Sequence, residues 1–217
     1  MCRFLLSYKL LGHSEEEKHS FLQALNLMKS GGPDSQGYDL YSNNSVLMGH
    51  NRLALRDLSS LANQPYSSFS KNSRIIFNGE IYNHIYLRNL LPNQNWLTKS
   101  DTETLVELLE AFGPSFVIPK LSGMFAFAFH DIKKNIFYIA RDKNGIKPLY
   151  IYYSGNYSNL IVSSEIKGIL NANRNRKFTI SEEARNEYFY FGYIRQSNTI
   201  YNEIKSITTE GYLEFNI

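Results

Sequence analysis

The second residue of the chain is a cysteine whose position could give it unusual chemistry. If Met1 is removed, which a small second residue permits, Cys2 carries both a thiol and a free α-amine. The ordinary pKa of an α-amine is roughly 7.7–8.0, so much of it is neutral near pH 7 and can take the thiol proton directly or through one water. One residue would then supply both nucleophile and base. The alternative is a thiol buried in the first strand, as free cysteines commonly are.

Asn78, Gly79 and Glu80 follow an expected strand at 74–77 and could contribute an oxyanion hole. An asparagine side-chain N–H beside a backbone N–H supplies two donors that can stabilise a tetrahedral intermediate. Glycine at position 79 would let the backbone approach a ligand closely. The alternative is ordinary turn chemistry after a strand.

Arg52 and Asp101 together suit the two charged ends of a free amino acid. The arginine fork can bind an α-carboxylate, and the aspartate can hold an α-ammonium. Each residue also has a simpler interpretation. Arg52 could be a solvated charge at a strand end, and Asp101 an acid that complements the dipole of a helix in its first turn.

Residues 30–35 read Ser-Gly-Gly-Pro-Asp-Ser, which is the spelling of the phosphate-binding loop of ATP pyrophosphatases. That loop requires a buried strand before it and a helix after it, so that backbone N–H groups face the phosphates. Here a helix is expected before the segment and a strand after it, and Pro33 removes one donor. The inverted context disfavours ATP binding at this segment.

Capping residues and apolar side chains at helical spacing indicate the helices that must position these candidates. Ser14 with Glu17, and Ser100 with Glu103, have the spacing of a capping box. Asn83 could cap a short third helix. The expected helices start at Ser14, Asn83, Ser100 and Ser181 and extend to about residues 28, 91, 112 and 190.

Strand signals fill the intervals between the helices. The expected strands cover residues 2–8, 37–41, 45–49, 74–77, 124–129, 135–140, 148–153 and 159–163. Short polar connections between the last four favour antiparallel neighbours, and nearly continuous apolar runs suit strands that are buried on both faces. The pattern therefore predicts an α+β domain of layered sheets and helices.

Length and composition exclude several classes of protein. The chain has 217 residues, which suits one domain, and its net charge of +3 is too small to indicate nucleic-acid binding by itself. It has no apolar run long enough for a membrane span and no secretory signal pattern, so we expect a cytoplasmic domain. A single cysteine excludes an internal disulfide. The five histidines lack metal-site spacing, and His50 is the one expected near a site.

Taken together, the motifs resemble the glutaminase domain of class II glutamine amidotransferases, specifically the N-terminal half of glutamine-dependent asparagine synthetases. The resemblance covers essentially all of the chain, and the ordered set is far more specific than any single motif. The matching motifs, in family order, are Met1-Cys2 and residues 32–34, 49–53, 64–65, 78–83, 100–101, 123–128, 140–142, 145–150, 164–167 and 191–193.

The resemblance implies a fold and a set of residue roles. The fold would be that of N-terminal-nucleophile hydrolases, a four-layer αββα sandwich of two antiparallel sheets. Cys2 would be the nucleophile, with its own amine as base. The implied oxyanion hole comprises the Asn78 side chain and the Gly79 N–H, and the implied glutamine-binding residues are Arg52, Leu53, Leu55, Glu80 and Asp101.

The resemblance also implies partners and cofactors. The substrate would be L-glutamine, and the ammonia would pass to an ATP-dependent synthetase domain or subunit, with asparagine synthesis the favoured use. We expect residues 1–217 to form one amidotransferase domain without the synthetase domain. We expect no metal or other cofactor for this half, with ATP and Mg confined to the synthetase. A homodimer is possible, and neither nucleic acid nor membrane is expected as a partner.

Two departures from the family pattern keep alternatives open. Arg3 stands where the family usually has glycine, and Gly31 stands where it usually has arginine. Arg3 could crowd the pocket, and Gly31 could loosen the loop that covers glutamine. One alternative is therefore a catalytically inactive amidotransferase-like binding module. A further alternative does not depend on these departures, because its pocket residues would be identical: an ammonia donor for a different carboxylate, such as a sugar acid or a natural product.

Overall fold

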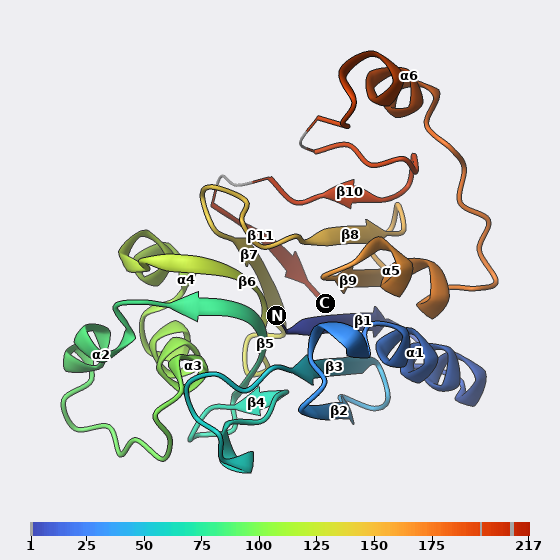
Figure 1. The fold of residues 1–217 in the computed structure, drawn as a ribbon. Helices are drawn as coiled ribbons and strands as arrows, with labels where there is room; N and C mark the ends of the chain where they lie inside the picture. Colours follow the sequence, from blue (N-terminus) through green and yellow to red (C-terminus); the bar gives the residue numbers. More distant parts are fainter. Residues whose placement is uncertain (1, 196, 209–210) are drawn as a thin grey trace.

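A computed structural model describes residues 2–195, 197–208 and 211–217, and its core is a pair of antiparallel sheets (Figure 1). The first sheet has the strand order β10 (Lys205–Ser206), β8 (Tyr150–Tyr153), β9 (Asn159–Ser163), β1 (Arg3–Lys9), β3 (Val46–Arg52), β2 (Ser35–Tyr41). The second has the order β11 (Tyr212–Asn216), β7 (Ile136–Arg141), β6 (Gly123–Asp131), β5 (Ser73–Ile81), β4 (Tyr66–Ser67).

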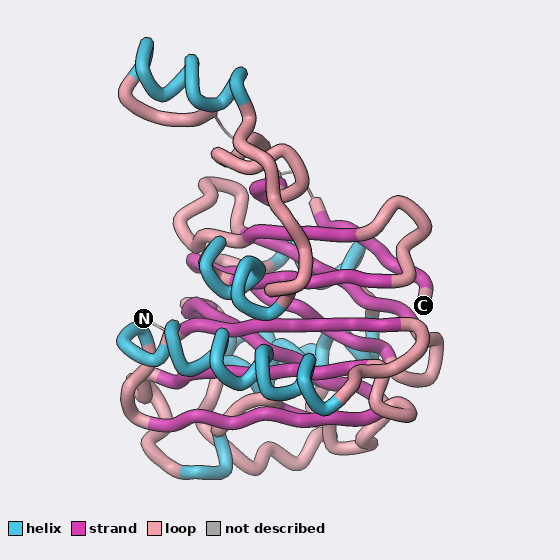
Figure 2. The backbone as a smooth tube through the Cα atoms, turned by 90° about the vertical axis from the view of Figure 1, so that its right-hand side faces the viewer, coloured by secondary structure: helices cyan, strands magenta, loops and turns pink. Residues whose placement is uncertain are grey.

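Helices cover the outer face of each sheet. The side chains of α1 (Glu15–Leu27) and α5 (Ile166–Ala172) pack with the first sheet, and Figure 2 shows helices crossing in front of its strands. The second sheet is covered by α2 (His84–Leu87), α3 (Asp101–Phe112) and α4 (Pro114–Val117). Short 3-10 turns occupy Lys29–Gly31, Ser60–Ala62, Arg88–Leu90 and Ile118–Lys120.

Three apolar cores hold these layers together. The central core lies between the sheets and includes Phe4, Ile76 and Phe137, all fully buried. One outer core joins the first sheet to α1 and α5, and the other joins the second sheet to α2, α3 and α4. The expected four-layer αββα arrangement is confirmed, as is the expectation of strands that are buried on both faces.

The sixth helix, α6 (Glu182–Phe191), lies apart from both sheets (Figures 1 and 2). Ser181 caps it by accepting the Ala184 N–H, and Gly192 ends it in the left-handed conformation. None of the helices in the described part of the chain is long and apolar enough to span a membrane.

Two of the three predicted capping arrangements differ from the structure. The box at Ser14 and Glu17 is confirmed, with both reciprocal bonds present. Ser100 does cap α3, but Glu103 instead accepts the N–H groups of residues 97 and 98, so it holds the preceding loop rather than the cap. Asn83 makes no capping bond because its side chain bridges to Lys120 and Ser122.

The strand predicted at 74–77 continues to Ile81, so the prediction that residues 78–80 follow the strand was wrong. The reason is tertiary, because β6 pairs with β5 along its whole length, from Ser73 with Asp131 to Ile81 with Gly123. Close packing of the pair requires glycine at 79, where an added Cβ would lie 2.2 Å from the Met124 carbonyl oxygen. No local pattern had indicated α4, α5 or the edge strands β4, β10 and β11.

Candidate active site

One cavity gathers every site residue that the sequence predicted. It is lined from the start of β1, the end of β3, the middle of β5, the first turn of α3 and the turn that follows β7. The predicted residues in its lining are Cys2, Arg52, Leu53, Leu55, Asn78, Gly79, Glu80 and Asp101. They come together because β1 pairs with β3, whose end continues into Leu53, and because β5 crosses from the other sheet.

The Cys2 thiol lies against the backbone of Leu53. The sulfur accepts the Leu53 N–H at 3.3 Å and lies 3.6 Å from the Leu53 carbonyl oxygen, to which the thiol donates. Burial raises the pKa of the Cys2 thiol, and the Leu53 backbone and the charge of Arg52 oppose that rise. A thiol in this setting holds its proton near neutral pH and needs a base to become a nucleophile.

The Asn78 side chain is buried in the cavity wall without a partner. It is 1% exposed, and neither its amide nitrogen nor its amide oxygen makes a hydrogen bond to any described residue. Buried side-chain amides are nearly always bonded, and an unsatisfied one costs about 1–3 kcal/mol. An unpartnered amide in the wall of a cavity that also holds a thiol is typical of a group whose partner is a ligand.

The backbone N–H of Gly79 turns away from the neighbouring strand. Gly79 lies opposite Phe125 of β6, but Phe125 does not bond to it. The Phe125 N–H donates to Asp142 Oδ2 at 3.2 Å, and the Phe125 carbonyl oxygen accepts the Asp142 N–H at 2.7 Å. In a non-hydrogen-bonded antiparallel pair, the N–H and C=O groups of both residues point away from the partner strand. The Gly79 N–H therefore points away from β6, and Gly79 is part of the cavity lining.

Other bonds along the same edge of β5 fix the strand. The Phe77 N–H donates to Gln64 at 2.6 Å, and His50 Nε2 donates to the Phe77 carbonyl oxygen at 3.0 Å. Burial lowers the pKa of His50 to about 4, so the ring is neutral at pH 7. His50, the histidine expected near the site, thus supports β5 through this bond. It is not among the described residues that line the cavity.

Asp101 is a buried carboxylate at the start of α3. It is 7% exposed, and its Oδ2 accepts the Ile81 N–H at 2.8 Å. Burial raises the pKa of the Asp101 carboxyl, and the Ile81 N–H and the charge of Arg56 oppose the rise. An ammonium group placed beside this carboxylate would restore much of the solvation that burial removed.

Arg52 binds the loop that follows β3. Its Nη1 donates to the Ser59 carbonyl oxygen and to Asn63 Oδ1, each at 2.8 Å, and its Nη2 donates to the Asp57 carbonyl oxygen. These bonds use three of the five guanidinium N–H groups. Arg52, which was predicted to bind the α-carboxylate, therefore also organises the loop at 53–63.

The Glu80 carboxylate is already ion-paired with Arg56, at 2.5 Å from Nε. Arg56 Nη1 also lies 3.3 Å from His84 Nε2. Arg56 also lines the cavity, although no sequence motif indicated it. A ligand ammonium near Glu80 would share that carboxylate with Arg56. Of the two predicted leucines, Leu55 is 67% exposed, which places it at the rim.

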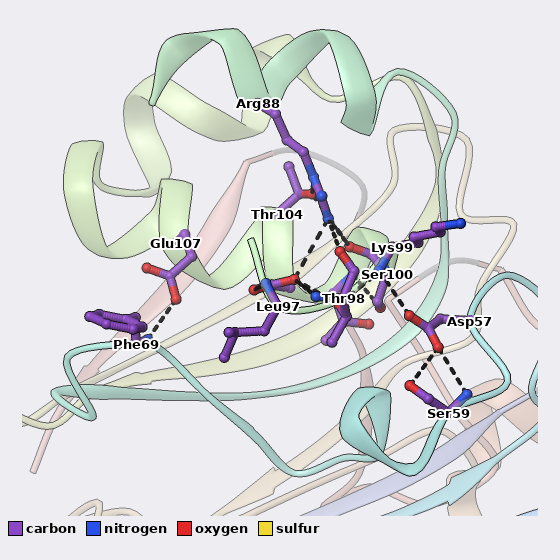
Figure 3. A network of polar contacts seen from close by, with 12 residues as sticks. Asp57, Ser59, Phe69, Arg88, Leu97, Thr98, Lys99, Ser100, Thr104 and Glu107 are labelled. Carbon is purple, nitrogen blue, oxygen red and sulfur yellow. Dashed lines mark hydrogen bonds and ion pairs between the residues drawn. The ribbon is translucent and has the colours of Figure 1, made fainter. Parts of the chain in front are cut away.

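A polar network ties the same loop to the start of α3 (Figure 3). Asp57 Oδ1 accepts the N–H and the hydroxyl of Ser59, and its Oδ2 accepts the Lys99 N–H at 2.8 Å. Beside it, Arg88 Nη2 donates to the carbonyl oxygens of Thr98 and Ser100, each at 3.0 Å. The network holds the Arg52 loop and the Asp101 helix start in one arrangement.

Several lining residues received no role from the sequence, and they include Gln64, Thr102, Met124 and Lys147. Gln64 and Lys147 stand within the matching motifs at 64–65 and 145–150, so a signal was present without a chemical reason attached to it. The segment at 30–35 lies between a helix and β2, as expected. Its Asp34 accepts the Ala54 N–H at 2.8 Å, so it supports the cavity loop.

The sequence and fold both match known proteins. The family model described as "Glutamine amidotransferase domain" matches residues 1–216. A putative glutamine-hydrolyzing asparagine synthetase from Methanocaldococcus jannaschii is 34% identical over 207 residues, covering 88% of this chain and 39% of that protein. A glutamine-hydrolyzing asparagine synthetase from Triphysaria versicolor is 38% identical over 172 residues, covering 78% of this chain and 28% of that protein.

The fold is that of a solved amidotransferase. Glutamine phosphoribosylpyrophosphate amidotransferase from B. subtilis, complexed with ADP and GMP, superposes with a TM-score of 0.65 at 19% identity. The match covers 99% of this chain and 49% of that one. The chain therefore spans about half the length of this structure and two fifths or less of the two sequence relatives.

We predict that Asp57 stabilises the folded protein in a pH-dependent way. Its hydrogen bonds to Ser59 and Lys99 lower the pKa of the Asp57 carboxyl to about 2. Because the folded pKa is below its ordinary value of about 4, the stabilisation is complete above about pH 4 and is lost as the pH falls toward about 2. Urea unfolding across this range should show wild type more stable than Asp57→Asn at neutral pH, with the difference shrinking in acid.

The control for this prediction is Glu16→Gln, which removes an exposed acid in the first turn of α1. Its unfolding should not reproduce the loss between about pH 4 and about pH 2. A gap between wild type and Asp57→Asn that stays constant into acid would contradict the assigned role of the carboxylate.

Proposed function

This chain belongs to the glutamine amidotransferase domain family, and from that premise we propose that it hydrolyses the side-chain amide of glutamine to glutamate and ammonia. The observation that carries the proposal is the buried, unpartnered Asn78 amide in the same cavity as the Cys2 thiol. The relatives described as glutamine-hydrolyzing support the substrate.

The proposed nucleophile is Cys2 at the start of the mature chain. Met1 lies outside the described residues, and the proposal requires its removal so that the Cys2 α-amine is free. That amine takes the thiol proton as the sulfur bonds to the amide carbon of glutamine. The protonated amine then gives the proton to the leaving nitrogen, so that ammonia departs and a γ-glutamyl thioester remains. Water adds to the thioester carbon, and glutamate leaves as the thiol re-forms.

The tetrahedral intermediates place a negative oxygen between two donors. The Asn78 amide N–H and the outward Gly79 N–H are the proposed pair. Neither donor must give up another bond to a described residue to serve in this way, since the amide is unpartnered and Phe125 bonds to Asp142 instead. Donors that are already in place cost no reorganisation when the charge develops.

The two ends of glutamine have separate proposed partners. The α-carboxylate binds the remaining N–H groups of Arg52 together with backbone around Leu53 and Leu55. The α-ammonium binds the buried Asp101 carboxylate, for which no ion pair with another described residue is seen, and it also approaches the Glu80 carboxylate. This arrangement selects a free amino acid over an amide in a peptide, because both charges must be present.

We propose that the ammonia passes to an ATP-dependent ligase, in another domain or subunit, and that its use is asparagine synthesis. The descriptions of the sequence relatives support that use, and this chain matches two fifths or less of their length. ATP and Mg would belong to the ligase part. A different carboxylate acceptor, such as a sugar acid or a natural product, would use the same glutamine pocket.

The second candidate function, an inactive binding module, was motivated by Arg3 and Gly31. Arg3 pairs with Glu165 and donates to the Cys2 carbonyl oxygen, and it is not among the described residues that line the cavity. It therefore does not crowd the pocket. Gly31 ends a 3-10 turn, and Gly32 next to it packs so tightly that a Cβ would lie 2.2 Å from the Asn51 carbonyl oxygen.

The first prediction of this function concerns Cys2. Purified protein should release glutamate from glutamine, its intact mass should lack Met1, and Cys2→Ala should show no turnover because the nucleophile is gone. Overlapping far-UV circular dichroism spectra would show that the fold is retained. Turnover that survives Cys2→Ala removes this residue from the mechanism, and an inactive wild-type protein with Met1 absent favours the binding module.

The oxyanion hole is tested at Asn78. Asn78→Ala should lower kcat by about 10²–10³-fold with little change in KM, since the lost bond forms mainly in the transition state. Asn83→Ala deletes the same side chain from the residue that bridges Lys120 and Ser122, and kcat should stay near wild type. An Asn78→Ala enzyme with wild-type kcat would contradict the assignment.

The α-ammonium contact is tested by pairing a variant with a shortened substrate. Asp101→Asn should lower kcat/KM for glutamine by roughly ten- to a hundredfold, the loss expected for one charged hydrogen bond. The same variant should have little effect on glutaramate, which carries the amide and the carboxylate but no α-amine. Equal losses on both substrates would show that Asp101 has a structural role only.

A further inference from the structure

Lys147 is a buried cation in the wall of the catalytic cavity, and nothing in the proposed reaction employs it. Its side chain is 1% exposed and ranks among the largest fully buried side chains of the described residues. It is the one lysine among the described residues that line the cavity, where it shares the wall with Cys2. Buried lysines are rare unless a specific interaction compensates for lost hydration, so its position calls for a physical reason.

The turn that carries Lys147 is held rigidly by two residues. Asp142 accepts four backbone N–H groups, those of Phe125, Asn144, Ile146 and Lys147. Arg141 donates to the carbonyl oxygens of Gly145 and Lys147. The backbone of Lys147 is thus fixed at both its N–H and its carbonyl group. The side chain thus starts from a fixed backbone position, and its burial keeps it from water.

Lys147 and Cys2 line the same cavity, so their charges can influence each other. Burial lowers the pKa of the Lys147 ammonium, and the Cys2 sulfur is the largest opposing influence, ahead of Asp142. Asp142 is a weak competitor because its carboxylate is satisfied by backbone donors. Negative charge on the Cys2 sulfur would therefore stabilise the buried ammonium.

The other charged groups around Cys2 are largely engaged with one another. On its own strand, Arg3 pairs with Glu165, which also pairs with Lys167. From β3, Arg52 adds positive charge but binds the loop at 57–63. The acidic groups from β5 and α3 are Glu80, which pairs with Arg56, and Asp101, which binds the Ile81 N–H.

We propose that Lys147 is a positioning residue for the nucleophile, whose buried ammonium stabilises negative charge on the Cys2 sulfur. The inference rests on the proposed function and extends it to a lining residue of the same cavity that has no role in the proposed glutamine contacts. Burial raises the pKa of the thiol, and a buried cation in the same cavity opposes that effect.

The test uses the fact that Cys2 is the only cysteine in the chain. Alkylation by iodoacetamide, followed by intact mass, therefore reports this thiol alone, and its rate follows the thiolate fraction as pH rises. In Lys147→Met the pH of half-maximal rate should move upward by about 1 unit, because an opposite charge is lost. Lys147→Arg should lie near wild type. Lys143→Met removes an exposed lysine from the same turn and should leave the profile unchanged.

Thermal melting identifies the variants that fold, and Lys147→Gln serves as a second neutral variant if Lys147→Met does not. A folded neutral variant whose profile overlays wild type, or moves downward, overturns the proposal. The alkylation assay contains no glutamine, so its outcome is independent of turnover. A wild-type protein that shows the Lys147 effect but hydrolyses no glutamine would overturn the proposed function and leave the charge effect standing.

Discussion

The antiparallel pairing of β5 with β6 is the constraint on which the site depends. Its register decides which backbone groups of β5 bond to β6 and which face outward. Phe77, Gly79 and Ile81 all fall on the outward edge, where two of them meet Gln64, His50 and Asp101. A shift by one residue would turn the Gly79 N–H into the sheet and bring Asn78 to the wrong face. The geometry of the proposed oxyanion hole thus depends on sheet register.

Desolvation is the second recurring feature of the site. The Cys2 thiol and the Asp101 carboxyl both have pKa values raised mainly by burial, and the Asn78 amide is buried without a partner. Each of these groups is less well solvated than it would be in water. A ligand with a carbonyl oxygen and an ammonium group would compensate for several of these costs at once. The cavity therefore favours a small polar molecule that carries a carbonyl oxygen and an ammonium group.

The loop at 53–63 links the cavity to its surroundings. Arg52 at the end of β3 binds its backbone, and Asp57 bonds within it to Ser59. Asp34 of the segment at 30–35 accepts the Ala54 N–H, and the Lys99 N–H before α3 donates to Asp57. These bonds give a structural role to the segment at 30–35 and to Arg52. The segment at 30–35 supports a loop, and Arg52 divides its guanidinium between the loop and the cavity.

Much of the fold follows from local patterns in the sequence. The helix at Ser14 and the long apolar strands were predictable, because capping chemistry and hydrophobic runs act over a few residues. The edge strands β4, β10 and β11 were not, since two to five residues carry too little pattern and pair only after the sheets form. Residues 78–80 were predicted to follow the strand, and they continue it because they pair with β6.

The sequence by itself also predicted which residues would line the site. It specified the thiol at position 2, the candidate donors at 78 and 79, and the charged residues for an amino acid, because their types and order match a known family. Only the tertiary structure decided that Arg56 forms an ion pair with Glu80, that His50 supports β5, and that Lys147 shares the cavity with Cys2. Those outcomes depend on contacts between segments far apart in the chain, and no local pattern encodes which buried groups face one another.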